Sequence, residues 1–228
     1  MYCSAKGWQW FLYYSPKKAA FLEVVVHKLC PDDIGLRKVL LDLCRTRWAL
    51  RDKAYGNFFK FFKYVVTALE VIGLKEHNDD FPDNQEWSYE NRSDAKVRLN
   101  TITDFEFIIT FVIVYIYLNH LAGPTVRFQG KALDIIGAYA EIENIKKTYY
   151  EERRNIEIRF HYVYEVAVEL ARLVNVEPDM PRIVQRQKYK NNNPANTPEE
   201  YYRRNIAIPF IDHIESELKS LFSEFSLT

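Results

Sequence analysis

The residues that could bind a metal ion are a histidine and two cysteines in the first quarter of the chain. His27 and Cys30 have the form His-x-x-Cys, and Cys44 follows. Zinc prefers ligands of these types but needs four in a structural site, and no fourth ligand lies nearby in the sequence. Free cysteine is commonly buried as a small apolar residue. We therefore expect structural thiols and no metal site.

Carboxylates and histidines spaced along a helix could hold two metal ions. The candidate pairs are Glu157 with His161 and Glu165 with Glu169. Di-metal bundles use Glu-x-x-His units from two helices, and the sequence contains none. A solvated helical face is the favoured interpretation. No Ser/His/Asp or Cys/His arrangement can be assembled from spacing either, so we expect no catalytic residues, no cofactor and no enzyme activity.

An arginine beside a tryptophan is the first feature that suits nucleic acid. Arg47-Trp48 is flanked by Arg45 and Arg51. A guanidinium pairs with phosphate, and an indole offers a stacking face to an unstacked base. From residue types alone, a tryptophan packed in the core with an arginine stacked on it is favoured over a DNA contact.

A basic segment bounded by prolines is the second such feature. It carries four cations in nine residues, namely Arg182, Arg186, Lys188 and Lys190. Cations at this density could follow a phosphate backbone. Glu199 and Glu200 come soon after and offset the field, so a DNA contact and an ordinary solvated connection stay equally open.

Composition indicates a helical protein with a substantial core. Of 228 residues, 48% are apolar and only 7 are glycine, which disfavours a turn-rich β sandwich. Lys+Arg and Asp+Glu are balanced at 31 each, so a wholly basic nucleic-acid protein is disfavoured but a local patch is not. The most apolar run, 107–118, is shorter than the roughly 20 residues of a membrane span. We expect a buried helix, no membrane partner and no small-molecule ligand.

Several helices are predicted in the first half of the chain. Ser15-Pro16 starts one that ends at Cys30, with Phe21, Leu22, Val25 and Leu29 on its buried face. The other helices are expected at 36–43, at 55–69 with Gly73 as terminator, from a cap at Ser93 to Ile102, and from a capping box at Thr103 to a stop at Gly123-Pro124.

A very long helical stretch, about 127–174, is predicted in the second half. The residues expected to face inward are Leu133, Ile136 and Ala140, and later Ile156, Phe160, Val163, Ala167, Leu170 and Val174. Residues 149–155 look too polar for a core and could be a break. Residues 177–197 should be non-helical. Thr197-Pro198 then starts a last helix, which Pro209 should kink after Ile208.

Four segments, in this order, resemble the transposase-derived hAT proteins. They begin at Ser15-Pro16-Lys17-Lys18, Leu43-Cys44-Arg45-Thr46-Arg47-Trp48, Pro181-Arg182-Ile183-Val184 and Thr197-Pro198-Glu199-Glu200, the last leading to Ile208-Pro209-Phe210. The similarity is greatest to the animal branch with zinc finger MYM-type and repressor-of-kinase-inhibitor-like proteins, and it covers nearly the whole chain.

The resemblance implies part of a larger architecture. Such proteins have an RNase H-like fold with an Asp-Asp-Glu metal triad, interrupted by a helical insertion domain that helps to hold transposon-end DNA. All three carboxylates are expected to lie outside this chain, so no divalent metal site and no transposition chemistry are expected here. Arg47 and Trp48 match a motif implicated in handling a base flipped out near the cleavage site.

The sequence therefore predicts an all-α protein. A helical remnant of the RNase H-like fold should span 1–48, and the insertion domain 49–228. The predicted function is that of a catalytically inactive, truncated transposase derivative that retains DNA binding through Arg47, Trp48 and the 182–190 segment, with nuclear localisation implied by the resemblance. The alternatives are a helical module that binds a protein partner or itself, and a decayed remnant without selected function.

Overall fold

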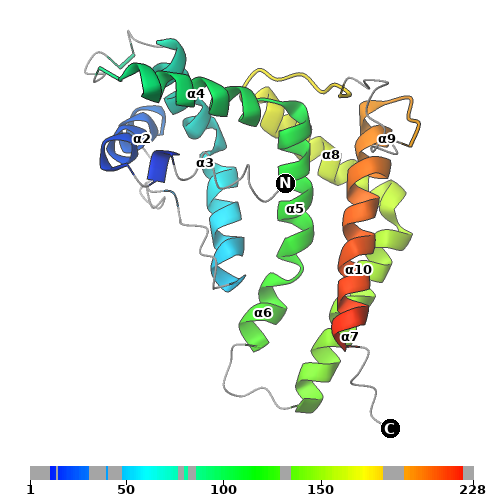
Figure 1. Cartoon of the computed structure of the whole chain (residues 1–228). Helices are drawn as coiled ribbons and strands as arrows, with labels where there is room; N and C mark the ends of the chain where they lie inside the picture. Colours follow the sequence, from blue (N-terminus) through cyan, green and yellow to red (C-terminus); the bar gives the residue numbers. More distant parts are fainter. Residues whose placement is uncertain are drawn as a thin grey trace. The chain divides into compact units, whose positions relative to one another are not determined.

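The computed structural model of the chain describes most of its residues as helix (Figure 1). The described ranges are 11–13, 15–30, 40, 48–76, 80–81, 86–128, 135–181 and 193–222. No strand occurs within these ranges. The expectation of a predominantly helical protein is confirmed for this part of the chain. The predicted helix at 36–43 and the inward-facing Leu133 lie outside it.

The helices keep the labels of Figure 1. They are α2 (Pro16–Leu29), α3 (Trp48–Leu74), α4 (Tyr89–Ile102), α5 (Phe105–Asn119), α6 (Ala122–Phe128), α7 (Ile135–Arg154), α8 (Ile156–Arg172), α9 (Pro198–Tyr202), the π-helical turn η1 (Arg203–Ala207) and α10 (Ile208–Phe222). Two compact units divide them: residues 1–107 with 173–176, and residues 108–172 with 177–228. This division leaves the expected boundary between 48 and 49 as a prediction.

In the first unit, α3 packs against both α2 and α4. The apolar stripe that the spacing predicts along it, namely Phe58, Phe59, Phe62, Val65, Val66 and Leu69, is buried except at Phe59, which is half-buried. Gly73 was expected to end this helix, which is wrong. A Cβ at Gly73 would lie 3.1 Å from the backbone nitrogen of Lys96, so the glycine permits the close approach of α4. The left-handed residue that follows the helix is Lys75, with φ 61°.

The predicted start and end of α2 are confirmed, but its buried face differs in one residue. Proline is the first helical residue after Ser15, and the helix ends before Cys30. Phe21, Leu22 and Val25 are buried, whereas Leu29 is 43% exposed and Val26 is buried instead. Position 26 follows 22 at helical spacing, so it continues the same stripe.

Two predicted caps sit on the wrong residues. The cap of α4 is Ser88, whose hydroxyl accepts a hydrogen bond from the Asn91 amide at 3.3 Å; Ser93 lies inside the helix. At α5, the Glu106 amide donates to Asp104 Oδ1 at 2.8 Å. The Thr103 hydroxyl is instead bonded back to α4, where it donates to the Leu99 carbonyl at 2.7 Å.

Gly123-Pro124 was expected to stop a helix and instead lies in the first turn of one. α5 ends at Asn119, and α6 contains both residues. A proline is tolerated there because the first-turn amides have no intrahelical partner. The apolar run 107–118 belongs to α5, and its residues Ile108, Ile109 and Val112 are fully buried, which confirms the expected buried helix.

The long helical stretch of the second unit breaks at Asn155, between α7 and α8. The prediction that 149–155 is too polar for a core is wrong for two residues, because Tyr149 is fully buried and Glu152 is 8% exposed. They continue a stripe that begins at Ile142 and Ile145. The predicted inward face of α8, including Phe160 and Val163, is confirmed.

The predicted burial of Ile136 and Ala140 at the start of α7 is wrong. Ile136 is 80% exposed, and Ala140 is exposed as well. α10 runs antiparallel to α7 (Figure 1) and Asp212 pairs with Arg153. The ten steps from Asp212 to Phe222 advance about 15 Å at ~1.5 Å per residue, which covers α7 only as far back as about residue 143. The first turns of α7 therefore extend beyond this partner.

The predicted start of the last helix is confirmed. The distortion expected at Pro209 lies earlier, in the turn before it. Thr197 caps α9 by accepting a hydrogen bond from the Glu200 amide at 3.2 Å. Before Pro209, the backbone forms the π-helical turn η1, in which the Ile208 amide bonds to the Arg203 carbonyl. Proline has no amide hydrogen, and its ring crowds the carbonyl four residues back. The wider π-helical turn lies just before Pro209, where this constraint acts.

Within the described part of the chain, no single helix is long and apolar enough to cross a membrane. α4 and α5 pass that test only when they are taken together across the break between them.

Candidate nucleic-acid interface

Most residues predicted to contact DNA lie outside the described part of the chain. These are Arg47, Arg182, Arg186, Lys188 and Lys190. Trp48 is the first residue of α3, and its side chain is not among those described. The predicted contacts of these six residues therefore stay predictions. What the structure does show is how the chain on either side of the 182–190 segment is held.

The residues before the basic segment are fixed by a buried tyrosine of α9. Tyr202 is fully buried, and its hydroxyl donates a hydrogen bond to the carbonyl of Asp179 at 3.0 Å. Asp179 and Pro181 are the last residues described before the segment begins. The chain therefore enters the basic segment from a fixed point on α9.

The residues after the basic segment are fixed by an asparagine of η1. Asn205 Oδ1 accepts a hydrogen bond from the Asn193 amide at 2.7 Å, and Asn205 Nδ2 donates to the Asn193 carbonyl at 3.1 Å. The same Nδ2 donates to the Tyr201 carbonyl at 3.0 Å. Next to this pair, Arg204 Nη1 donates to the Pro194 carbonyl at 2.7 Å. The chain leaves the basic segment bonded to η1.

Ion pairs attach α9 and η1 to α8. Arg203 Nη1 lies 2.7 Å from Glu157 Oε2, and His161 Nδ1 lies 3.1 Å from Glu199 Oε1. Glu157 and His161 were expected on a solvated face; both are more than 60% exposed, and both also face α9 and η1. Among the described residues, no group of three or more possible ligands is placed to hold a metal ion.

Arg203 and Arg204, which follow the basic segment in the sequence, add little uncompensated positive charge. Arg203 pairs with Glu157, and Arg204 Nη2 lies 2.7 Å from Glu200 Oε1. Since their charges are compensated, a positive field in this region would have to come from the 182–190 segment.

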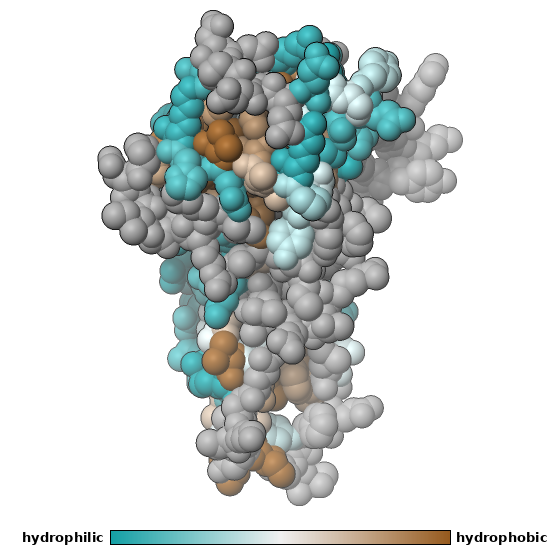
Figure 2. Space-filling view, turned by 90° about the vertical axis from the view of Figure 1, so that its left-hand side faces the viewer, coloured by the Kyte–Doolittle hydropathy of each residue, from teal (hydrophilic) through white to brown (hydrophobic). Residues whose placement is uncertain are grey.

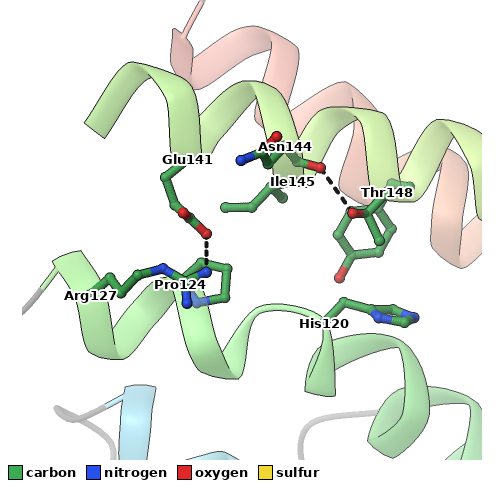
Figure 3. A pocket seen from close by; sticks show the side chains of 8 residues that line it. His120, Pro124, Arg127, Glu141, Asn144, Ile145 and Thr148 are labelled. Carbon is green, nitrogen blue, oxygen red and sulfur yellow. Dashed lines mark hydrogen bonds and ion pairs between the residues drawn. The ribbon is translucent and has the colours of Figure 1, made fainter. Parts of the chain in front are cut away.

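A small cavity of about 190 Å³ lies between α6 and α7 (Figure 3). Its lining residues are His120, Pro124, Arg127, Glu141, Asn144, Ile145, Thr148 and Tyr149. Arg127 and Glu141 are hydrogen-bonded to each other across it. Because these two charges compensate each other, the cavity presents an ion pair and not an isolated charge to a ligand.

Beside the cavity, two tyrosines and a carboxylate are buried together. Tyr149 Oη donates to the Tyr117 carbonyl at 2.7 Å, and Glu152 Oε1 lies 3.9 Å from His120 Nε2 and 3.7 Å from Arg159 Nη1. Burial, and secondly the Glu152 charge, raises the pKa of Tyr117 and of Tyr149. Both phenols therefore stay protonated at neutral pH, and the Tyr149 phenol serves as a donor.

This hydrogen bond lies in the last turn of α5, and its contribution to the stability of the protein can be measured. The last carbonyls of α5 have no intrahelical partner, and Tyr149 satisfies that of Tyr117. We expect Tyr149→Phe to lower the free energy of unfolding by about 1–3 kcal/mol, because a buried carbonyl loses its donor while the ring stays packed. Urea denaturation followed by circular dichroism measures this. Tyr150→Phe, on the exposed face of α7, should leave stability unchanged, and equal losses in both variants would contradict the assignment.

Exposed apolar side chains gather where α6 ends and α7 begins. Val126 and Phe128 are 60% and 40% exposed, and Ile135 and Ile136 are 76% and 80% exposed. Figure 2 shows brown, hydrophobic side chains at its lower end, where Figure 1 places these two helix ends. We call these four residues the α6–α7 apolar surface.

Known proteins include chains that are similar to this one. The "52 kDa repressor of the inhibitor of the protein kinase" of Mus musculus is 27% identical over 214 residues, and that of Homo sapiens is 26% identical over the same length. In both cases the match covers 94% of this chain and 27% of the relative, so the chain spans about a quarter of the relatives' length. No family profile and no solved structure matches. The chain is thus a distant homologue of these repressor proteins over nearly all of its own length.

Proposed function

We propose that this chain is a helical module derived from a hAT-type transposase that binds DNA and performs no catalysis. The observation that supports the proposal is that the described chain on either side of the 182–190 segment is bonded to α9 and η1, by Tyr202 at Asp179 and by Asn205 at Asn193. The four cations of the sequence between these two points would contact successive phosphates.

Fixed ends favour binding for a thermodynamic reason. Ordering a segment upon binding costs free energy, and part of that cost is already met when its ends are held in the folded protein. Phosphate contacts then contribute through counterion release.

The distant relatives support a regulatory role. Both relatives are described as repressors, and neither description names an enzyme activity. The hAT resemblance of the four ordered sequence segments adds DNA as the partner and the nucleus as the location. In this proposal, Arg47 and Trp48 form a second contact, at a distorted DNA end.

Binding to hairpin-ended and plain duplex DNA across a salt series tests the proposal. We expect an affinity that falls steeply with salt, measured by fluorescence anisotropy. Trp48→Ala should weaken binding to hairpin ends by about 5–150-fold, which corresponds to the roughly 1–3 kcal/mol of base stacking, and should affect plain duplex less. Tyr89→Ala, which removes an exposed aromatic ring from α4 in the first unit, is the control for loss of an aromatic side chain.

A second candidate function is supported by the α6–α7 apolar surface. Four large apolar side chains exposed together are typical of a surface that binds a protein partner or a second copy of the chain. A module with this function needs no affinity for DNA. Its association with a protein partner or a second copy should not depend on salt concentration. Absence of DNA binding at low salt, by protein shown to be folded, would contradict the first proposal and favour this one.

A further inference from the structure

We infer that Lys18 is a reactive amine and a site of acylation by acyl thioesters. Lys18 lies in the first turn of α2, and its side chain is half-buried. Its Nζ stands 3.5 Å from the centre of the Phe11 ring. Lysine attacks an acyl carbon only as the unprotonated amine, and a lysine becomes a good nucleophile beside apolar groups or another cation. Both conditions are met around Lys18.

The apolar neighbour of Lys18 is the ring of Phe11. This ring is only 5% exposed. With Nζ 3.5 Å from the ring centre, one side of the ammonium group faces carbon atoms and cannot be hydrated there. The loss of hydration opposes the charged form. The face of the ring attracts a cation and favours the charged form, so the balance depends on which other charges lie nearby.

The second cation is Arg98 of α4, which lies at the same ring. Its guanidinium carbon is 5.1 Å from the centre of the Phe11 ring. Because a guanidinium does not lose its proton in a protein, only Lys18 can relieve the repulsion between the two. Asp94 Oδ2 lies 3.7 Å from Arg98 Nη2, but the Asp94 side chain is 63% exposed. Water and salt therefore screen the charge that would compensate this arginine.

The position of Lys18 in α2 acts in the same direction as Arg98. The amides of a first helical turn lack intrahelical partners and carry a positive partial charge. The first turn of α2 contains Lys18 and no acidic residue. Burial lowers the pKa of Lys18; the Asp94 charge opposes this shift and the Arg98 charge adds to it. More of the amine is thus unprotonated near neutral pH than in an ordinary lysine.

The reaction is a transfer of an acyl group from sulfur to nitrogen. The unprotonated Nζ of Lys18 attacks the thioester carbonyl carbon, a C–N bond forms and the C–S bond breaks. The thiolate leaves, and the proton lost by the nitrogen ends on the sulfur, so the products are an amide and a thiol. No oxidation or reduction takes place. Acylation removes the charge of Lys18 and leaves Arg98 as the one cation of this pair at the Phe11 ring.

Incubation of the folded protein with acetyl-coenzyme A in the absence of an enzyme tests the inference. Mass spectrometry after partial reaction gives the rate of acetylation at each lysine. We expect Lys18 to react about threefold faster than Lys17, because more of its amine is unprotonated. Lys17 is the matched internal control: it is the preceding residue and more exposed, and its Nζ donates to the Glu86 carbonyl at 3.1 Å. In denaturing urea the two lysines should react at equal rates.

Two variants that change one neighbouring charge each should act in opposite directions. Arg98→Gln should slow the acetylation of Lys18, since the like charge is gone and Asp94 is released. Asp94→Asn should accelerate it, since the opposing charge is gone. Lys60→Gln, at an exposed position of α3, removes one cation away from this ring and should leave the rate at Lys18 unchanged. Circular dichroism shows that each variant is folded.

Each outcome supports or overturns the reactive lysine. A rate at Lys18 no higher than at Lys17 in the folded protein overturns it, and so does an excess that persists in urea, because the fold would then not be the cause. Changes of the same sign in Arg98→Gln and Asp94→Asn contradict the electrostatic explanation. Asp94 is on the surface, so Asp94→Asn remains a test if Arg98→Gln does not fold.

Discussion

Replacing the four cations of the basic segment by glutamine is expected to remove most of the salt dependence of DNA binding. The variant carries Arg182→Gln, Arg186→Gln, Lys188→Gln and Lys190→Gln. If all four cations contact phosphates, they contribute a slope of about −3.6 to the logarithmic salt dependence, at roughly −0.9 per contact. Between 50 and 200 mM salt such a slope is worth about 100-fold in affinity. The variant should therefore bind weakly at all salt concentrations.

The control has the same change in net charge at another place. It replaces the exposed lysines Lys53, Lys60, Lys63 and Lys75 of the first unit by glutamine. Fluorescence anisotropy on plain duplex should show a salt slope close to that of the unchanged protein. Equal loss of slope in the two variants would mean that overall charge, and not the basic segment, attracts the DNA, and would contradict the proposed interface.

Local signals in the sequence were sufficient for several elements of the fold. Proline after a capping residue located the starts of α2 and α9, at Ser15-Pro16 and Thr197-Pro198. Apolar spacing identified the buried faces of α3 and α8. These features depend on interactions within a few residues, which a short stretch of sequence contains completely.

Features that depend on a distant partner could not be obtained in this way. Gly73 resembles a terminator until Lys96 of α4 is placed against it. Tyr149 and Glu152 look solvated because their partners Tyr117, His120 and Arg159 come from other helices. Likewise, Ile136 fits an apolar stripe but lies beyond the end of its packing partner. The type of a residue does not indicate which distant residues lie beside it in the fold.

The features of the candidate site divide in the same way, into those visible in a short stretch of sequence and those that depend on a distant partner. The 182–190 segment was found from composition, because a dense run of cations between prolines is visible in sequence. The hydrogen bonds of Asn205 to Asn193 were not predicted, since they join residues on either side of a helix start. The only signal was Pro209, which marked a disturbed helix but placed it after Ile208 and not at Arg203–Ala207.

The core of the second unit offers the largest expected effect on stability, through Phe160→Ala. Phe160 is fully buried in the middle of α8, and removing a buried phenylalanine ring costs about 3–5 kcal/mol through lost burial and the cavity left behind. A domain is stable by only about 5–15 kcal/mol in total. Urea denaturation followed by circular dichroism should therefore show a midpoint far below that of the unchanged protein.

The matched control lies two residues further along the same helix. Tyr162 is 67% exposed, and Tyr162→Ala should change the free energy of unfolding by no more than about 0.5 kcal/mol. Similar stability in the two variants would show that α8 does not form the core of this unit.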